Sequence, residues 1–558
     1  MTERTKSTLC QARMKYSPKL PKSLKGGASG VKVVKGVATR SVSDQEAVKS
    51  LFPRTYGAPI VSFEAGHSEG KGGPLNVGVV LSGGQAPGGH NVIAGIFDGI
   101  KSVHKDSRLF GFLRGPDGLA NNKFIDITSD LIDQYRNSGG FDIIGSGRTK
   151  LETEDQFNKC IEVVKANNLS TIVIIGGDDS NTNAAILAEY FKTKSVSCSV
   201  LGCPKTIDGD LKNEYIETSF GFDTAVKTYA QLIGNIARDA NSAKKYWHFI
   251  KLMGRSASHI GLEAALQTRP NFCLISEEVA EKKITLDQIV NDLANVIEKR
   301  ASLGKNFGVA VIPEGLIEFI PEMKKLISEL NDCMDQKEKE LEKLDKVSDK
   351  IKKVSQAISR ESADVLLKLP EEIQGELLLD RDPHGNVQVS LIETEKLLIE
   401  LVTRTLKSRP SYKGKFSTQH HFFGYEGRCA HPSNFDADYG YSLGYSAAVL
   451  AYNGLSGYMA QVSGLAKGND NWKAGGIPIV MMMNMEKRHG KEKPVIQKAL
   501  VKLESRAFRH FAENRDKWAT TESYLYPGAI QYFGPSEICD TVTETLVFDS
   551  MDIDEKRR

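Results

Sequence analysis

The stretch Asn76–Leu81 reads NVGVVL and runs directly into SGGQAPGGHN, which covers Ser82–Asn91. A short apolar run that leads into a glycine-rich loop and then into an amphipathic segment is typical of a buried parallel strand followed by a helix. The expected helix has one apolar face, because its apolar residues fall three and four positions apart: Ile93, Ile96, Phe97, Ile100 and Val103. This stretch predicts an α/β fold.

The same pattern of apolar run, polar or glycine-rich loop and helical segment recurs along the chain. The later runs, each with the loop that follows it, are Thr171–Ile175 (TIVII, then GGDDSN), Ser197–Leu201 (SCSVL, then GCPKTIDGDL), Trp247–Leu252 (WHFIKL, then MGRSASHI) and Phe307–Ile312 (FGVAVI, then PEG). Short runs with few charges indicate buried parallel strands. We therefore expect mainly parallel central sheets with helices on both faces, and a further buried strand at Ile477–Met483.

A chain of 558 residues is too long for one ordinary core, so two lobes are expected. The segment from Glu322 to about Leu406 interrupts the α/β pattern, because it is rich in Lys and Glu. Its apolar residues recur at helical spacing: Leu341, Leu344, Val347, Ile351, Val354 and Ile358. We expect a helical insertion with one apolar seam, for which a helical hairpin is one arrangement, and we interpret its charges as a solvated face.

The charges of the chain nearly balance, with 73 Lys and Arg against 70 Asp and Glu and a net charge of +3. This balance gives no reason to expect a nucleic-acid or membrane partner, and no apolar run approaches the length of a bilayer span. The eight cysteines are scattered and none forms a CxxC pair. A zinc site or a disulfide framework is therefore not expected, and a reducing compartment fits.

The first forty residues hold ten Lys and Arg against a single acid, Glu3. Two interpretations stay open. One is an organelle transit peptide, which is typically basic and poor in acids. The other is a mobile arm or a packing extension, which is the commoner case for a basic N-terminal segment.

Loops at the carboxyl ends of parallel strands are where open sheets bind ligands, and all five loops lie at such ends. In the first loop, Gly83 and Gly84 allow backbone N–H groups to approach a phosphate, and the N-terminus of the following helix favours an anion. The alternative is a tight turn between strand and helix, because the loop matches neither the Walker A pattern nor GxGxxG.

The second loop carries two adjacent carboxylates, Asp178 and Asp179. One acid at a strand end often holds Mg²⁺, and two neighbouring acids beside a phosphate site favour a bound cation. The alternative is a helix N-cap formed by Asp179 or Ser180. We prefer a Mg²⁺ site at Asp178.

The third loop, PKTIDGD at positions 204–210, combines a lysine, a hydroxyl and two carboxylates. Lys205 can neutralise phosphate charge, and Asp208 can accept a proton from an attacking alcohol. Gly209 allows a sharp turn between the two acids. A polar surface turn is the alternative, and it accounts less well for so dense a cluster directly after a buried strand.

Three further residues are candidates for ligand contacts. Arg148 and Arg255 can each grip a phosphate with two N–H groups, and Glu314 can accept hydrogen bonds from sugar hydroxyls. Each of the three is equally explained as a member of an ion pair.

Taken together, the segments GGQAPGGHN, GGDDS, PKTIDGD, MGR, PEG and YEGR resemble the phosphofructokinase family, from about Leu75 to the C-terminal region. The run RDPHGNVQVSLIETEKLL, within Leu369–Val402, is similar to the long pyrophosphate-dependent branch of that family. The resemblance implies Mg²⁺-dependent, reversible transfer of a phosphoryl group from pyrophosphate to the C1 hydroxyl of fructose 6-phosphate. The products would be fructose 1,6-bisphosphate and phosphate, in glycolysis and gluconeogenesis.

The resemblance also implies roles for individual residues. The general base is Asp208, and the other catalytic residues are Thr206, Asp210, Lys205 and Asp179. Pyrophosphate is bound by Gly83, Gly84, Arg148 and Lys205, and the metal by Asp178. Fructose 6-phosphate is bound by Lys205, Thr206, Ile207, Asp208, Lys245, Tyr246, Met253, Gly254, Arg255, Glu314, Tyr425, Glu426, Gly427 and Arg428.

Two positions are expected to choose the phosphoryl donor. ATP-dependent relatives have Gly where this chain has Asp179, and usually Gly where it has Lys205. A carboxylate at Asp179 would repel and obstruct the α-phosphate of ATP, whereas Lys205 supplies positive charge to a compact diphosphate. The alternatives are an ATP-dependent phosphofructokinase and a non-catalytic regulatory subunit, and the presence of the family's core catalytic residues argues against the second.

The family's sugar-phosphate site takes residues from a neighbouring subunit, at positions that match Lys245 and Tyr246. We therefore expect a homodimer or a higher homo-oligomer. ATP-dependent relatives tend to carry arginine where this chain has Tyr246, so binding across the subunit boundary is expected to be weaker or differently arranged. The pyrophosphate-dependent branch shares the tyrosine.

The expected domain order follows from these assignments, and we expect the chain in the cytoplasm. The segments are an N-terminal extension (1–75), a phosphoryl-donor and metal lobe (76–240), the first part of a sugar-phosphate lobe (241–320), the helical insertion (321–410), the second part of the sugar-phosphate lobe (411–490) and a closing C-terminal segment (491–558).

Overall fold

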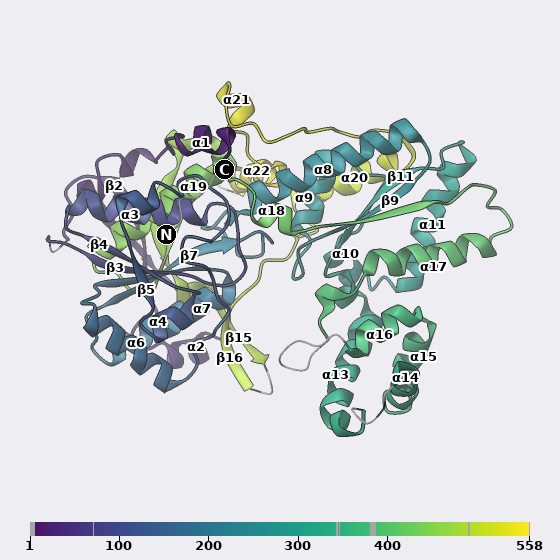
Figure 1. Ribbon diagram of the computed structural model, residues 1–558, viewed down its shortest axis with the longest axis horizontal. Coiled ribbons are helices and arrows are strands. Elements are labelled where there is room, and N and C mark those ends of the chain that lie inside the picture. The colour runs from purple at the N-terminus through teal and green to yellow at the C-terminus, as the bar shows by residue number, and fades with distance from the viewer. Residues whose placement is uncertain are drawn as a thin grey trace. The chain divides into compact units, whose positions relative to one another are not determined.

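The computed structural model describes residues 6–70, 72–341, 344, 346–379, 387–488 and 491–556 (Figure 1). The chain forms two compact units, each built from segments that are distant in sequence. Unit 1 comprises Met1–Thr228, Tyr425–Ala499 and Ile530–Arg558, and unit 2 comprises Tyr229–Gly424 and Leu500–Ala529. Each unit has its own central sheet, as the predicted α/β fold with two lobes requires.

The main sheet of unit 1 has the strand order β1-β2-β14-β13-β7-β6-β3-β4-β5, and β8 pairs with β7. The strands are β1 Val31–Ala38, β2 Pro59–Ala65, β3 Asn76–Leu81, β4 Arg108–Phe112, β5 Phe124–Ile127, β6 Thr171–Gly176, β7 Ser199–Thr206, β8 Phe220–Gly221, β13 Tyr458–Ser463 and β14 Lys473–Pro478. The central strands β13, β7, β6, β3 and β4 run parallel, and the outer pairings are antiparallel. The predicted strands at Asn76, Thr171 and Ser197 are confirmed.

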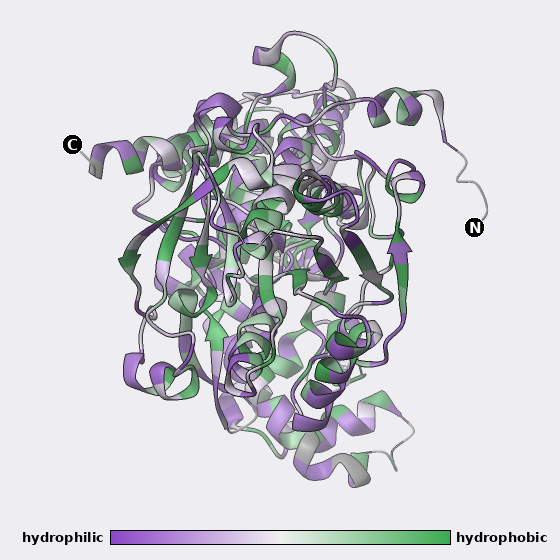
Figure 2. Ribbon diagram, turned by 90° about the vertical axis from the view of Figure 1, so that its left-hand side faces the viewer, coloured by the Kyte–Doolittle hydropathy of each residue, from purple (hydrophilic) through white to green (hydrophobic). Residues whose placement is uncertain are grey.

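Unit 1 also contains helices. They are α1 Thr8–Met14, α2 Gln45–Leu51, α3 Gly89–Val103, α4 Pro116–Ala120, α5 Ser129–Ile132, α6 Glu154–Ala166, α7 Asp178–Thr193, α18 Tyr425–Arg428, α19 Asn434–Tyr452, α21 Ser536–Cys539 and α22 Glu544–Lys556. Of these, α3, α7 and α19 have the most buried residues. In α3 the predicted apolar face is confirmed, because Ile93, Ile96 and Ile100 are fully buried. Figure 2 shows the strands as mainly hydrophobic ribbons, while the helices carry both hydrophobic and hydrophilic residues.

The basic N-terminal extension is part of unit 1 and packs against its other segments, as one of the two interpretations anticipated. Arg13 is buried, and its guanidinium donates hydrogen bonds to Asn434 Oδ1 at 2.6 Å and to the carbonyl of Pro432 at 2.9 Å. The same guanidinium stacks on the rings of Tyr16 and Tyr532, at 4.5 Å from each ring centroid. The extension therefore fixes the loop that leads from α18 into α19.

The expected strand at Ile477–Met483 is wrong. β14 ends at Pro478, a 3₁₀ turn covers Ile479–Met482, and β15 Met483–Arg488 then pairs with β16 Lys491–Ile496. Most of the apolar residues in Ile477–Met483 are buried, but a buried apolar segment need not be a strand. The segment instead turns directly after Pro478, a residue that cannot donate to a sheet.

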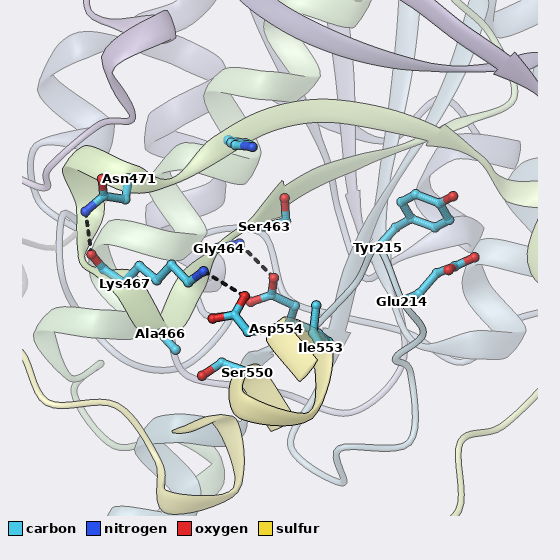
Figure 3. A pocket seen from close by; sticks show the side chains of 12 residues that line it. Glu214, Tyr215, Ser463, Gly464, Ala466, Lys467, Asn471, Ser550, Ile553 and Asp554 are labelled. Atoms are coloured by element: carbon cyan, nitrogen blue, oxygen red, sulfur yellow. Dashed lines mark hydrogen bonds and ion pairs between the residues drawn. The ribbon is translucent and has the colours of Figure 1, made fainter. Parts of the chain in front are cut away.

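The C-terminal helix α22 lies against the segment that follows the third loop. Lys212 pairs with Asp549 at 2.6 Å, and Lys467 pairs with Asp554 at 3.0 Å. Figure 3 shows the small pocket beside this contact, with Lys467 and Asp554 on its wall.

Unit 2 has a parallel sheet with the order β10-β11-β9-β12. Its strands are β9 Trp247–Leu252, β10 Phe272–Cys273, β11 Gly308–Pro313 and β12 Thr418–Phe423. Its helices include α9 His259–Thr268, α10 Ser276–Glu281, α11 Leu286–Ser302, α12 Leu316–Phe319, α17 Thr394–Ser408 and α20 Arg506–Thr520. The boundary between the units falls within α8, Phe222–Ala243. The strands predicted at Trp247 and Phe307 are confirmed.

The predicted insertion is helical. It holds α13 Pro321–Leu341, α14 Val347–Ser355, α15 Arg360–Lys368 and α16 Glu371–Leu379, which gather in one group in Figure 1. The expected apolar seam runs across the end of α13 and along α14, where Leu341 and Val354 are buried and Ile351 and Ile358 pack against them. These side chains belong to the same apolar cluster as Trp247 and Phe249 of β9, so the insertion extends the core of unit 2. Residues 381–386 of the run RDPHGNVQ lie outside the described residues.

The compact units divide the chain differently from the expected lobes at several places, most clearly in residues 411–490, while residues 500–529 of the expected closing segment belong to unit 2. Residues 411–490 were expected to complete the lobe that begins at residue 241. Only Thr418–Phe423 (β12) joins the sheet of unit 2, whereas β13 and β14 join the sheet of unit 1. All eight cysteines are free thiols. Among the described residues, none of the helices combines the length and apolar character needed to cross a bilayer.

Candidate active site

The glycine-rich loop, the loop with two acids and the loop PKTIDGD meet at one edge of the unit 1 sheet. They follow β3, β6 and β7, which are parallel neighbours. Carboxyl ends of parallel strands lie at the same edge of a sheet, so the three loops are brought together by the strand order alone. Ser82, which opens the first loop, is bonded to β6 and to α7: Ser82 N donates to the Ile175 carbonyl at 2.8 Å, and Ser180 Oγ donates to Ser82 Oγ at 2.8 Å.

Gly83 brings backbone without a side chain close to a buried ammonium group. Its φ is +85°, a left-handed conformation that favours glycine, and a β carbon added there would lie 3.6 Å from Lys205 Nζ. The N–H group of Gly83 already donates to the Gly147 carbonyl at 2.9 Å. What Gly83 offers a ligand is therefore the absence of a side chain next to Lys205.

Gly84 is bordered by two guanidinium groups. A β carbon on Gly84 would lie 3.1 Å from Nη2 of Arg428 and 4.0 Å from Nη2 of Arg148. Arg428 lies in the short helix α18, where its guanidinium stacks on the exposed ring of Tyr425 at 5.1 Å. Of its neighbours in the YEGR motif, Glu426 is exposed and Gly427 is buried. Arg428, which the sequence assigned to the sugar phosphate, is thus placed beside the glycine-rich loop.

The loop after β7 is held by its own side chains. Asp208 N donates to Thr206 Oγ1 at 3.0 Å, and Thr206 Oγ1 donates to Asp210 Oδ1 at 3.3 Å. Gly209 has a φ of +75°, which provides the sharp turn between the two acids. Ile207 is buried, so its side chain anchors the loop while Asp208 stays partly exposed.

Burial and mutual charge shift the pKa values of this loop. Burial lowers the pKa of Lys205 to about 8, although the carboxylates of Asp208 and Asp178 act to raise it. Burial raises the pKa of Asp210 to about 7, with further increases from Asp208 and Asp178. Three carboxylates therefore share a confined site with one buried ammonium group, which is a favourable place for an added cation.

The acids of the second loop occupy the first turn of α7. The helix begins at Asp178, and its N-cap is Gly177, so the alternative of a cap by Asp179 or Ser180 is wrong. The partial positive charge of the helix N-terminus favours both carboxylates. Each has a lysine partner: Asp178 Oδ2 lies 3.6 Å from Lys498 Nζ, and Asp179 Oδ2 lies 3.2 Å from Lys150 Nζ.

In unit 2, the loop after β9 is locked to the loop after β11. Gly254 has a φ of +133°, and its N–H donates to Glu314 Oε2 at 2.9 Å. Glu314 is buried, whereas Arg255 is exposed. Met253 N donates to the Phe423 carbonyl of β12 at 2.9 Å. The structure thus brings Met253, Gly254 and Glu314 together at the carboxyl end of this sheet, and it leaves the Arg255 side chain exposed there.

Lys245 and Tyr246 lie at the opposite end of β9. The strand Trp247–Leu252 separates them from Met253–Arg255, and six residues at roughly 3.3 Å each span about 20 Å. The ammonium of Lys245 stacks on the Tyr246 ring at 4.9 Å. Within one chain, these two residues cannot bind the same small ligand as Met253–Arg255.

Sequence reasoning missed Lys150 and Lys498. Lys150 stands two residues after Arg148, and its neighbourhood gave a weak signal in the segment GSGRTK. Lys498 follows the β15–β16 pair, far from every motif in the sequence, and only the fold places it beside Asp178.

A sheet edge that combines a glycine-rich loop, a buried ammonium group, two guanidinium groups and clustered carboxylates defines an enzyme of the phosphoryl-transfer class. The phosphofructokinase family model matches residues 76–451, and the chain belongs to that family. The pyrophosphate–fructose 6-phosphate 1-phosphotransferase of Porphyromonas gingivalis is 54% identical over 550 residues, which cover 98% of this chain and 100% of the relative. The protein of the same name from Treponema pallidum is 55% identical over 552 residues, which cover 97% and 96%.

A solved structure of a pyrophosphate-dependent phosphofructokinase from Marinobacter aquaeolei has the same fold. Its TM-score is 0.53 at 16% sequence identity, over 81% of this chain and 93% of the other.

Proposed function

We propose that this chain transfers a phosphoryl group from pyrophosphate to the C1 hydroxyl of fructose 6-phosphate, reversibly, giving fructose 1,6-bisphosphate and phosphate. Relatives that are 54% and 55% identical over almost the whole chain carry that activity in their names. The observation that carries the proposal is the placement of Lys205 and Asp208 at one sheet edge, beside the glycine-rich loop at Gly83.

Asp208 is the general base. Its backbone is fixed by Thr206, and its partly exposed carboxylate can take the proton of the C1 hydroxyl as the oxygen attacks phosphorus. Thr206 and Asp210 hold the loop in place, while Ile207 anchors it in the core. Transfer then depends on positioning and charge, so no covalent enzyme intermediate is required.

Lys205 binds the donor and stabilises the transferred group. Its ammonium is protonated below its pKa of about 8, so it carries a charge at neutral pH beside Gly83. Arg148 and Arg428 border the same loop at Gly84 and add guanidinium donors for phosphate oxygens. These contacts replace the nucleoside interactions that a bare diphosphate lacks.

Asp178 is the ligand for Mg²⁺. The described residues contain no group of three or more His, Cys, Asp or Glu side chains arranged to hold a metal by themselves. A single carboxylate fits Mg²⁺, which usually keeps several waters and binds substrate phosphates. When bound, the ion would neutralise charge on the phosphates, and the carboxylates of Asp208 and Asp178, which act to raise the pKa of Asp210, support a place for added positive charge.

The rival donor is ATP, and Asp179 argues against it. Asp179 stands at the start of α7 and is held by Lys150 at 3.2 Å, so its carboxylate adds negative charge where a longer polyphosphate would extend. A non-catalytic subunit is disfavoured because the base, the lysine and the acid for the metal are all present at one edge.

For the binding of fructose 6-phosphate, unit 2 offers the loops after β9 and β11, and unit 1 offers the YEGR motif. Met253, Gly254 and Arg255 offer backbone and guanidinium donors, and Glu314 fixes the turn at Gly254. Lys245 and Tyr246 lie about 20 Å away along β9, at roughly 3.3 Å per residue, which supports a site completed by a neighbouring subunit in a homodimer or larger homo-oligomer. The eight free thiols support a reducing compartment, the cytoplasm.

The test is an assay of the purified chain alone with fructose 6-phosphate, Mg²⁺ and either pyrophosphate or ATP. We expect turnover with pyrophosphate and a kcat/KM for ATP lower by orders of magnitude. Turnover with ATP alone would replace the proposal with an ATP-dependent enzyme. Failure with both donors would indicate a non-catalytic subunit.

A further inference from the structure

The segment at the end of β16 and after it is hydrogen-bonded to the two elements that carry the acids of the donor site, which are α7 and the loop after β7. Ile496 N donates to Thr182 Oγ1 at 3.2 Å, and Thr182 lies on α7, four residues beyond Asp178. On the other side, Ala499 N donates to the carbonyl of Asp210 at 2.7 Å. Lys498 therefore stands on a backbone that is fixed between the metal acid and the catalytic loop.

The side chain of Lys498 turns toward the centre of this cluster. Its Nζ lies 3.6 Å from Asp178 Oδ2, with about a third of the side chain exposed. Its charge also opposes the rise in the pKa of Asp210. Lys498 thus acts on two of the three carboxylates, and it reaches them from the side of the β15–β16 pair, whereas Lys205 reaches them from β7.

An ion pair with this exposure contributes little to stability. A bare diphosphate, in contrast, has no nucleoside to bury, so its affinity must come from charged hydrogen bonds. A lysine is suited to such a site, since its compact charge sits on a flexible four-carbon stem and can move between neighbouring anions. The ammonium group of Lys498 cannot pair with Asp178 and bind a phosphate oxygen at the same time. A metal ion bound to the Asp178 carboxylate would take the place of Lys498 there.

We propose that Lys498 is a pyrophosphate-binding residue of the donor site, paired with Asp178 in the chain without ligand and turned to a phosphate oxygen of the donor when the metal occupies that carboxylate. This assignment rests on the proposed pyrophosphate-dependent reaction. The proposal adds the Lys498 ammonium, which lies outside every sequence motif, to the groups that bind the donor. It also makes the segment after β16 part of the donor site.

The experiment compares Lys498→Met, which keeps the apolar stem, with Lys498→Arg, which keeps the charge. Lys467→Met is the matched control, because Lys467 also pairs with one acid, Asp554 at 3.0 Å, on the wall of the pocket in Figure 3. The readouts are KM for pyrophosphate and for phosphate in the reverse reaction, KM for fructose 6-phosphate, and direct calorimetric binding of methylenediphosphonate with Mg²⁺.

In Lys498→Met we expect KM for pyrophosphate and the dissociation constant for the diphosphonate to rise together by about tenfold to a hundredfold, the loss of one charged hydrogen bond. KM for fructose 6-phosphate stays within about twofold, and Lys498→Arg recovers most of the affinity. Lys467→Met behaves as wild type.

Unchanged diphosphonate affinity in Lys498→Met overturns the inference, even if kcat falls, because Lys498 would then act only through the shape of the loop. A wild-type chain without pyrophosphate activity is a different failure, since it contradicts the proposed function itself. An equal loss in Lys498→Met and Lys498→Arg also overturns the inference, since charge would not be the property that matters.

Discussion

Lys205 Nζ lies 3.6 Å from the position that a β carbon on Gly83 would occupy. Gly83 lies in the loop after β3 and Lys205 lies near the end of β7, with β6 between the two strands, and only the strand order brings the two residues together. Gly83→Ala therefore places a methyl group beside the ammonium and strains a residue whose φ is +85°, a cost of about 1–2 kcal/mol. We expect KM for pyrophosphate to rise about tenfold, with KM for fructose 6-phosphate little changed.

Gly454→Ala is the control for the backbone strain in that experiment. Gly454 has a φ of +64° and nothing within 4 Å of an added β carbon. Equal kinetic effects of the two substitutions would mean that strain alone, and no contact at the donor site, explains the result.

Asp208→Asn removes the base and keeps the shape of the side chain. Since the amide cannot accept the proton, kcat is expected to fall by about 10²–10⁴-fold while both KM values change little. Steady-state kinetics in both directions measure this, with the exposed Asp106→Asn as control. Turnover of Asp208→Asn within a few-fold of wild type would remove Asp208 from the role of base.

Asp179→Gly removes the carboxylate that lies 3.2 Å from Lys150 Nζ. We expect kcat/KM with pyrophosphate to fall by about tenfold or more, and turnover with ATP to become measurable, because the charge that opposes a longer polyphosphate is gone. Lys150→Met separates loss of the ion pair from loss of the acid, and it should leave ATP excluded. Wild-type kinetics with both donors in Asp179→Gly would count against Asp179 as a determinant of donor choice.

The lowered pKa of Lys205 predicts an alkaline limit to donor binding. The ammonium is charged below its pKa of about 8 and loses its proton as the pH rises through that value, so kcat/KM for pyrophosphate should fall above about pH 8. In Lys205→Arg the guanidinium stays protonated, so the fall in kcat/KM above about pH 8 should disappear. The kcat/KM of this variant at neutral pH is expected to be lower than that of wild type. A pH profile from 6 to 10 measures both; the same fall in Lys205→Arg would assign it to another group.

Buried Arg13 makes the N-terminal extension a structural part of unit 1. Arg13→Met leaves Asn434 Oδ1 and the Pro432 carbonyl without this donor and removes the stacking on two tyrosine rings. We expect a loss of about 2–4 kcal/mol in stability, seen as a lower melting temperature. A melting temperature equal to that of wild type would show that the extension contributes nothing to the fold of the loop before α19.

The parallel strands and the residues at their ends could be predicted from sequence, because an apolar run followed by a polar loop is a local pattern. β3, β6, β9 and β11 appear within a residue or two of their expected bounds. Ile477–Met483 was mistaken for a strand, since an apolar run reports burial and the turn after Pro478 gives no stronger signal. The division of residues 425–499 could not be predicted either, because the choice of sheet for β13 and β14 depends on long-range pairing.

The site was predictable where one loop carries several reactive groups, as in PKTIDGD. It was not predictable where a lone lysine reaches the cluster from a remote segment, as Lys498 does. The proximity of Arg428 to Gly84 was likewise hidden, because these residues are more than three hundred positions apart.

The most direct test of the donor site is a crystal structure of the chain with methylenediphosphonate, Mg²⁺ and fructose 6-phosphate. The account predicts diphosphonate oxygens bonded to Lys205 Nζ beside Gly83, Mg²⁺ on Asp178, and the C1 hydroxyl within hydrogen-bond reach of Asp208. A diphosphonate that binds away from both Gly83 and Lys205 would contradict it.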